Sequence, residues 1–215
     1  MAMLKKSHTS MKAWIWKSIS NMNQLFKIIL LSLLCSIPAL LLIWRLLTDN
    51  LGANPVEYLE HTTGDWTIYF LLMTLMISPL QKQFSVKWHK VYLPTHLMRR
   101  ILGLAAFGYA LLHLTSYVVF DMGLSLSDTL SDIIERPFIT IGMVSFVLLF
   151  ALSVTSSSYA QRRLKQNWIK LHKSIYVLTF LGILHYALLV KADFFFPVLY
   201  MLIFAGLMIF RWRKN

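Results

Sequence analysis

Six long apolar segments decide what this chain can fold into. About 20 apolar residues are enough for a helix to cross the hydrocarbon of a bilayer. A helix is also stable there, because it satisfies its own backbone hydrogen bonds. We therefore predict an all-α fold, a polytopic membrane bundle of six transmembrane helices. The predicted spans are roughly 25–47, 65–81, 97–120, 137–156, 169–190 and 194–211.

Little of the chain remains outside these spans. The sequence is 57% hydrophobic, and its mean hydropathy is +0.61. We expect residues 1–24 to form a basic, amphipathic segment on the cytoplasmic surface, with Trp14 and Trp16 among lysines. Residues 25–215 then form the transmembrane domain. The first span is too long for a cleaved signal, and the single cysteine, Cys35, excludes an internal disulfide and an iron–sulfur cluster.

The net charge is +12, and the basic and acidic residues fall on opposite sides of the predicted spans. With six spans, 18 of the 21 basic residues fall on the side of the termini, whereas all nine acidic residues fall on the other. Basic loops stay cytoplasmic during insertion, so we expect both termini to be cytoplasmic and no nucleic-acid partner. The basic residues on the acidic side are Arg45, Arg136 and Lys191.

Two histidines, His113 and His185, lie inside predicted spans. An ionisable side chain at membrane depth indicates a functional site, and imidazole is a common axial ligand of haem iron. Asp121 and Lys191 follow these histidines by eight and six residues. At about 1.5 Å per residue, the rings lie roughly 12 and 9 Å below the outer ends of their helices. This matched depth allows both rings to bind one iron, although hydrogen bonding to a neighbouring helix is the alternative.

The third predicted span carries a stripe of small residues below His113. Recurrence every three or four residues places them on one helix face, where they would let a flat macrocycle approach. Plain helix packing gives the same pattern. Gly182 similarly lies on the face of His185. The stripe consists of Arg99, Gly103, Ala106, Ala110, His113 and Tyr117.

A second site is suggested nearer the inner surface. His172 precedes His185 by 13 residues, or about 20 Å, and Arg99 lies at the same level. His172 either binds a second haem iron or is a solvated interfacial residue. Arg99 either pairs with a haem propionate or anchors its helix at the headgroups. His61 begins the second predicted span, where we expect it to cap the helix or to approach the outer haem edge or a partner.

Several motifs have a recognisable order and spacing, and with them the chain resembles the MsrQ (YedZ) family. These proteins are haem-binding membrane subunits of the bacterial MsrPQ methionine sulfoxide reductase system, within the ferric-reductase-like transmembrane group. The resemblance covers about 45 to 211. The motifs are Leu51-Gly52-Ala53-Asn54-Pro55-Val56, His61-Thr62-Thr63-Gly64, Arg99-Arg100-Ile101-Leu102-Gly103-Leu104, Leu112-His113-Leu114-Thr115-Ser116-Tyr117, Arg136-Pro137, Leu171-His172-Lys173 and Leu184-His185-Tyr186.

The resemblance implies a function. It implies that residues 25–215 form a ferric-reductase-like haem domain in the bacterial inner membrane. Electrons would pass from quinol or a cytosolic flavin reductase to a periplasmic molybdenum-cofactor subunit (MsrP-like), which repairs oxidised methionines in envelope proteins. His113, His172 and His185 match three of the four haem-ligand positions of the relatives, and Arg99 occupies the fourth. One haem b is implied, two are compatible, and flavin mononucleotide (FMN) is associated with the family.

Two other functions fit the residues less well. A transporter or channel would use buried histidines to relay protons or bind substrate, but such proteins tend to show repeated halves and interrupted helices. A non-catalytic membrane anchor would need the histidines only for structure. In the preferred interpretation the chain is an electron-transfer subunit and does not itself reduce methionine sulfoxide.

Overall fold

The fold is helical throughout the part of the chain that the structure describes. The computed structural model describes residues 2–83, 93–190 and 194–212, with side chains from Asn23 onward apart from Lys82. No strand occurs in these residues. The elements are α1 (Ala2–Leu47), α2 (Pro55–Gln83), α4 (Thr95–Ser116), the π-helix η1 (Tyr117–Asp121), α5 (Leu126–Glu135), α6 (Pro137–Val154), α7 (Ser158–Leu164), α8 (Gln166–Lys173), α9 (Ile175–Leu189) and α10 (Phe195–Trp212).

Among the described residues, five helical segments are long and apolar enough to cross a membrane. The predicted second span lies in α2, whose polar residues, Asp65 among them, keep this helix out of that group. The multi-pass membrane fold is confirmed, and the count of six spans stays a prediction. The five segments are Asn23–Leu47, Thr95–Asp121, Pro137–Val154, Gln166–Leu189 and Phe195–Trp212.

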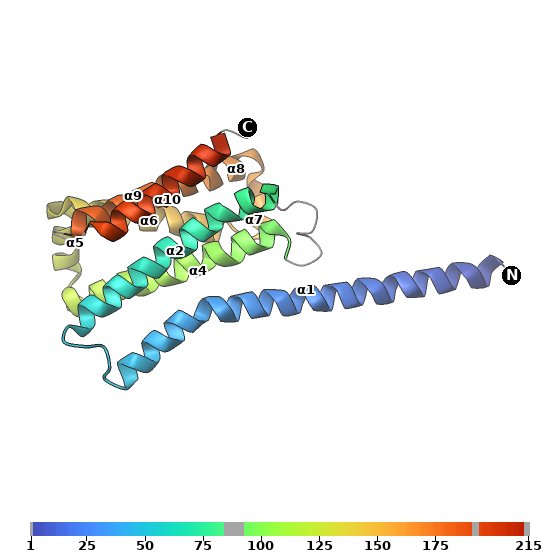
Figure 1. Ribbon diagram of the computed structural model, residues 1–215, viewed down its shortest axis with the longest axis horizontal. Helices are drawn as coiled ribbons and strands as arrows, with labels where there is room; N and C mark the ends of the chain where they lie inside the picture. The colour runs from blue at the N-terminus through green and yellow to red at the C-terminus, as the bar shows by residue number, and fades with distance from the viewer. Residues whose placement is uncertain (1, 84–92, 191–193, 213–215) are drawn as a thin grey trace.

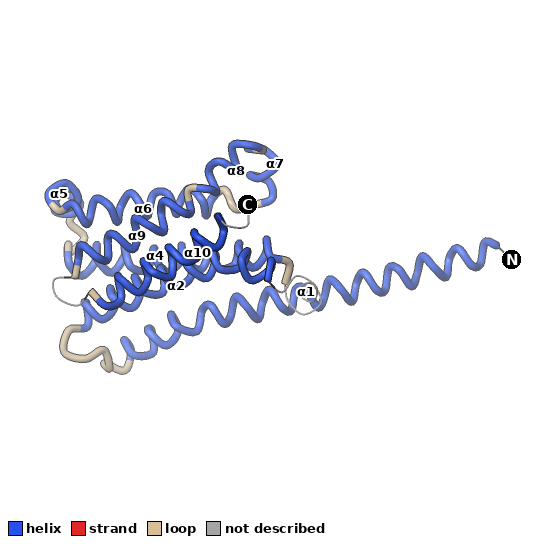
Figure 2. Tube along the Cα trace, turned by 45° about the horizontal axis from the view of Figure 1, so that its top comes forward, coloured by secondary structure: helices blue, strands red, loops and turns tan. Residues whose placement is uncertain are grey.

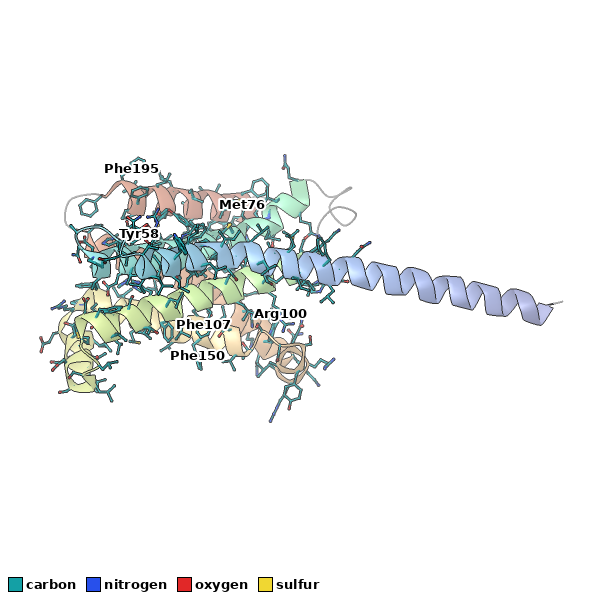
Figure 3. All side chains as sticks on the ribbon, turned by 90° about the horizontal axis from the view of Figure 1, so that it is seen from below. Tyr58, Met76, Arg100, Phe107, Phe150 and Phe195 are labelled. Atoms are coloured by element: carbon teal, nitrogen blue, oxygen red, sulfur yellow. The ribbon has the colours of Figure 1, made fainter. Side chains whose placement is uncertain are left out.

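The bundle is built from two closely packed helix pairs. Helix α2 lies along α4, and α6 lies along α9, while α10 packs against α9 and α2 (Figure 1). Between α4 and α6, the ring of Phe107 lies 5.9 Å from that of Phe150 (Figure 3). Both termini lie at the same end of the bundle, as an even number of spans requires. The side of the membrane to which they belong stays a prediction.

Helix α1 lies on the outside of the bundle, where Tyr109 of α4 bonds to its backbone beside Pro38. Pro38 lacks a backbone N–H and interrupts the hydrogen bonding of α1. At this point the backbone N–H of Ala39 donates to the Tyr109 hydroxyl (2.8 Å), which donates to the Cys35 carbonyl (2.9 Å). The hydroxyl of α4 thus replaces the direct bond from Ala39 to Cys35. The predicted segment 1–24 continues α1 without a break (Figure 1), and its side chains before Asn23 lie outside the described residues.

The fifth predicted span consists of two helices. Helix α8 ends at Lys173, and α9 begins at Ile175. Between them Ser174 turns its hydroxyl back onto the Leu171 carbonyl (2.7 Å). His172 therefore belongs to a different helix from His185, which affects where its ring points.

Candidate functional site

One cavity lies between the two helix pairs, and both membrane-embedded histidines line it. Its volume is about 240 Å³. His113 comes from the end of α4 and His185 from α9, while α2 and α6 form the remaining walls. The lining is mainly apolar, with Leu71, Leu149 and Leu178 among it. This is the composition of a pocket for a flat, largely apolar molecule.

The two imidazole rings face each other across this cavity. Their centroids are 6.2 Å apart, and their planes are inclined by 80°. Two imidazole–metal bonds of about 2.0 Å each, together with the ring radii, account for a separation of this size. In the described part of the chain, no group of three or more His, Cys, Asp or Glu side chains could hold a bare metal ion. The pair therefore fits a metal that brings its remaining ligands with it, as the iron of a porphyrin does.

Backbone carbonyls fix the orientation of both rings. Nδ1 of His113 lies 3.0 Å from the Glu60 carbonyl oxygen in α2, and Nδ1 of His185 lies 2.6 Å from the Phe138 carbonyl oxygen in α6. A carbonyl only accepts, so each Nδ1 carries the proton and donates. Each Nε2 is then left with its lone pair, which is the form in which histidine binds a metal.

Glycines make room around the rings. A Cβ atom at Gly142 would lie 2.9 Å from the ring of His185, and one at Gly64 would lie 3.5 Å from the ring of His113. At Gly182 nothing lies within 4 Å of the added carbon, so this residue borders open cavity. The sequence analysis singled out Gly182 but missed the roles of Gly64 and Gly142. A glycine in the middle of an apolar span was the only available signal for Gly142.

The stripe of small residues is only partly a cavity wall. Ala110, His113 and Tyr117 line the cavity. Ala106 is completely buried in the helix-packing core, and Gly103 faces open space on another side. At Ala106 the stripe therefore serves helix packing, the alternative named above.

Polar residues surround the mouth of the cavity, at the end of the bundle away from the termini. Asp132 of α5 accepts from the Tyr117 hydroxyl (2.6 Å) and pairs with Arg136 (2.7 Å). Glu60 lies before the predicted second span, at the same mouth as Asp121. Burial, followed by the nearby negative charge of Asp121, raises the pKa of Glu60 to about 7. The mouth thus combines acidic groups with a single arginine.

His61 belongs to the cavity wall and not to a helix cap. Helix α2 begins at Pro55, so the expected capping role is wrong. The His61 ring contacts the edge of Tyr186, with centroids 6.3 Å apart. Asp65, one turn further along α2, accepts from the Tyr200 hydroxyl at 3.1 Å. These residues form the polar side of the cavity.

The structure does not place His172 beside Arg99. The Nε2 atom of His172 lies 3.1 Å from the Thr155 hydroxyl at the end of α6, and its ring stacks on Trp168 with centroids 4.0 Å apart. Arg99 instead donates to the Ser78 hydroxyl of α2 (3.2 Å) and to the Thr95 carbonyl (3.3 Å). His172 is thus bonded to the end of α6, whereas Arg99 is bonded to α2 and to its own helix α4.

The end of the bundle near the termini carries a second cavity of about 370 Å³. Ser78, which accepts from Arg99, lines it together with Tyr176 and Arg211. Arg211 donates to the Tyr176 hydroxyl and to the Leu75 carbonyl (2.6 Å). This end of α2, α4 and α10 is therefore positively charged.

Comparison with known proteins agrees with this geometry. Residues 63–183 match the family model of the ferric reductase like transmembrane component. The chain is 43% identical over 176 residues to the protein-methionine-sulfoxide reductase heme-binding subunit MsrQ of Herminiimonas arsenicoxydans, covering 79% of this chain and 78% of that protein. It is 40% identical over 186 residues to the MsrQ of Brucella anthropi, covering 86% and 81%.

The match to the family model runs from Thr63 in α2 to Ile183 in α9, so it includes His113 and ends just before His185, and the matches to the relatives span most of both chains. The chain therefore belongs to the ferric-reductase-like transmembrane proteins and, within them, to the MsrQ family of haem-binding subunits of protein-methionine-sulfoxide reductase.

Proposed function

We propose that the chain holds haem b between His113 and His185 and uses it to carry electrons across the bacterial inner membrane. The observation that carries this proposal is the pair of facing imidazoles, each with its Nδ1 hydrogen-bonded to a carbonyl of another helix. When bound, the haem supplies a reversible one-electron couple. The chain acts as an electron-transfer subunit, and a separate subunit reduces methionine sulfoxide.

The residues of the chain have defined tasks in this mechanism. His113 and His185 would hold the haem iron through their Nε2 atoms, while the carbonyls of Glu60 and Phe138 keep the rings from turning. Carbonyl acceptors also increase the basicity of the ligating nitrogen, which favours the oxidised metal. Because the rings are fixed before an electron arrives, little reorganisation accompanies its transfer. Gly142 keeps α6 close enough to hold His185.

The direction of transfer follows from the proposed topology. With both termini cytoplasmic, the His113–His185 site lies nearer the periplasmic end of the bundle, with its acidic mouth facing that side. The acceptor is then a periplasmic molybdenum-cofactor subunit of the MsrP type. The donor is quinol or a cytosolic flavin reductase. Transfer from one to the other supports the repair of oxidised envelope proteins.

A second redox centre near His172 completes the route in this proposal. The hydrocarbon is about 30 Å thick, and a single outer haem leaves a long gap to the cytoplasm. We favour a second haem over FMN, with Arg99, a loop histidine or water as the other axial ligand. To bind iron, Nε2 of His172 must give up its contact with the Thr155 hydroxyl. Of the loop histidines, His89 lies outside the described residues, and His96 lies in the first turn of α4.

Visible spectroscopy of the purified protein tests the proposal. Oxidised and dithionite-reduced samples should differ by the sharp reduced bands of a low-spin b-type haem, and pyridine haemochrome content should give one or two haems per chain. A transporter, a channel or a plain anchor predicts no such bands. If the expression host supplies enough haem and the purified protein is monodisperse but colourless, the electron-carrier function is refuted.

A further inference from the structure

Helix α5 crosses the outer end of the bundle and has three distinct faces. Figure 2 shows it almost end-on, at the end of the bundle away from the N-terminus, while the long helices run across the picture. It begins after the cap of Ser125, whose hydroxyl accepts from the Asp128 N–H (3.3 Å). The helix is ten residues long, Leu126–Glu135. Each face differs in what it contacts.

The face toward the bundle is polar and already satisfied. Thr129 and Asp132 are buried there, at 7% and 9% exposure. Asp132 binds the Tyr117 hydroxyl and Arg136, both of which line the haem cavity. Polar contacts, together with the half-buried Ile133, therefore attach α5 to the rest of the protein.

The apolar face of α5, by contrast, is exposed. Leu126, Leu130 and Ile134 recur every four residues, so they share one stripe. They are 75%, 61% and 81% exposed. Leaving such side chains in water forgoes the free energy that burying them would gain. The third face, with Ser127, Asp128, Ser131 and Glu135, is exposed and polar.

The position of α5 in the chain indicates what covers the apolar stripe. A single residue, Arg136, separates α5 from the membrane-crossing helix α6, and four residues, 122–125, separate it from η1. Such short connections keep α5 at the membrane boundary. The preceding span ends in exposed apolar residues, Val119 and Phe120, that face the same boundary.

We propose that α5 is an interfacial helix whose Leu126–Leu130–Ile134 stripe is buried in the outer leaflet of the membrane. Helices of this kind insert their apolar face about 5–10 Å into the boundary between headgroups and acyl chains. Since α5 contains no Lys or Arg, its binding rests on apolar burial and not on attraction to anionic headgroups. The lipid then holds Asp132, and through it the Tyr117–Arg136 wall of the cavity, in place. This inference does not depend on haem or on the electron donor.

Site-directed spin labelling tests the proposal. In a Cys35→Ala background, single cysteines replace Leu130 and Ile134 on the apolar stripe, with Ser127 and Ser131 as matched positions on the polar face. The labelled full-length protein is placed in phosphatidylcholine nanodiscs. Collision rates with O₂, which partitions into lipid, and with a water-soluble Ni(II) chelate are then measured by power saturation. If the Leu130→Cys or Ile134→Cys variant does not fold, Leu126→Cys is labelled in its place.

The labels on the stripe should collide several-fold more with O₂ relative to Ni(II) than the labels at Ser127 and Ser131. This ratio should be unchanged when phosphatidylglycerol is added to the discs. Equal Ni(II) access on both faces would overturn the proposal. Stripe labels that are open to Ni(II) in the discs but shielded by the added periplasmic reductase would also overturn it, and would assign the face to a protein interface.

Discussion

Gly142 lies directly against the imidazole of His185, and a Cβ atom built there would be 2.9 Å from both Cε1 and Nδ1 of the ring. The ring has no simple way to withdraw, because Nδ1 is also hydrogen-bonded to the Phe138 carbonyl, one turn earlier on the same helix. Helix α6 thus orients the His185 ring through the Phe138 carbonyl and packs directly against it at Gly142. This double contact leads to the first prediction.

Gly142→Ala should lower the haem content of the His113–His185 site or convert it to a high-spin form, because the methyl group displaces the His185 ring. Absorbance spectra and pyridine haemochrome content measure the effect. The matched control is Gly108→Ala in α4, where nothing lies within 4 Å of the added carbon. That variant should retain the wild-type spectrum. A Gly142→Ala protein with unchanged haem and spectrum would show that the ring tolerates displacement.

His113→Leu and His185→Leu should each abolish the low-spin haem signal, because six-coordinate iron needs both imidazoles. Both variants should still insert in the membrane, since leucine is readily accepted in a span. His61→Leu provides the control: this ring lines the same cavity, but it contacts Tyr186 and is not one of the two facing imidazoles. It should keep low-spin haem. Wild-type haem content in both ligand variants would refute this ligation.

His172→Leu should reduce haem content toward one per chain while leaving the low-spin signal of His113 and His185 intact. It should also slow reduction from the cytoplasmic side more than electron delivery to the periplasmic side. Thr155→Val removes the hydroxyl beside His172 while keeping the imidazole, and it should retain the second haem. If stoichiometry, redox titration and inside-driven reduction are all unchanged in His172→Leu, then His172 is an ordinary interfacial residue.

Tyr109→Phe should loosen α1 from the bundle. The hydroxyl bridges Ala39 N–H and the Cys35 carbonyl beside Pro38, and its loss removes both hydrogen bonds between α4 and α1. Removing one partner of a buried hydrogen bond costs about 1–3 kcal/mol, so the unfolding temperature in detergent should fall. Tyr58→Phe removes a hydroxyl from an exposed contact with Arg45 and should have a smaller effect. Equal losses in the two variants would contradict a special role for Tyr109.

The sequence was sufficient wherever a property belongs to one segment of chain. Hydropathy over about 20 residues identifies a span from its own composition, so the membrane fold was predicted correctly. Helical periodicity is equally local, and it placed Ala110, His113 and Tyr117 on one face, as the cavity confirms. These local signals did not predict the ends of helices, which depend on contacts with other parts of the protein. Helix α2 extends past His61 to Pro55, and Ser174 divides α8 from α9.

The sequence by itself determined a multi-pass helical protein with two histidines at matching depth, because composition, spacing and charge bias act along the chain. Only the tertiary structure decided what surrounds them. The acceptors for His113 and His185 are the backbone carbonyls of Glu60 and Phe138, and every residue has a carbonyl, so no side chain marks which ones will be used. In the same way, His172 contacts Thr155 because α8 is hydrogen-bonded to the end of α6, where Trp168 donates to the Thr155 carbonyl, and no pattern within either helix specifies that contact.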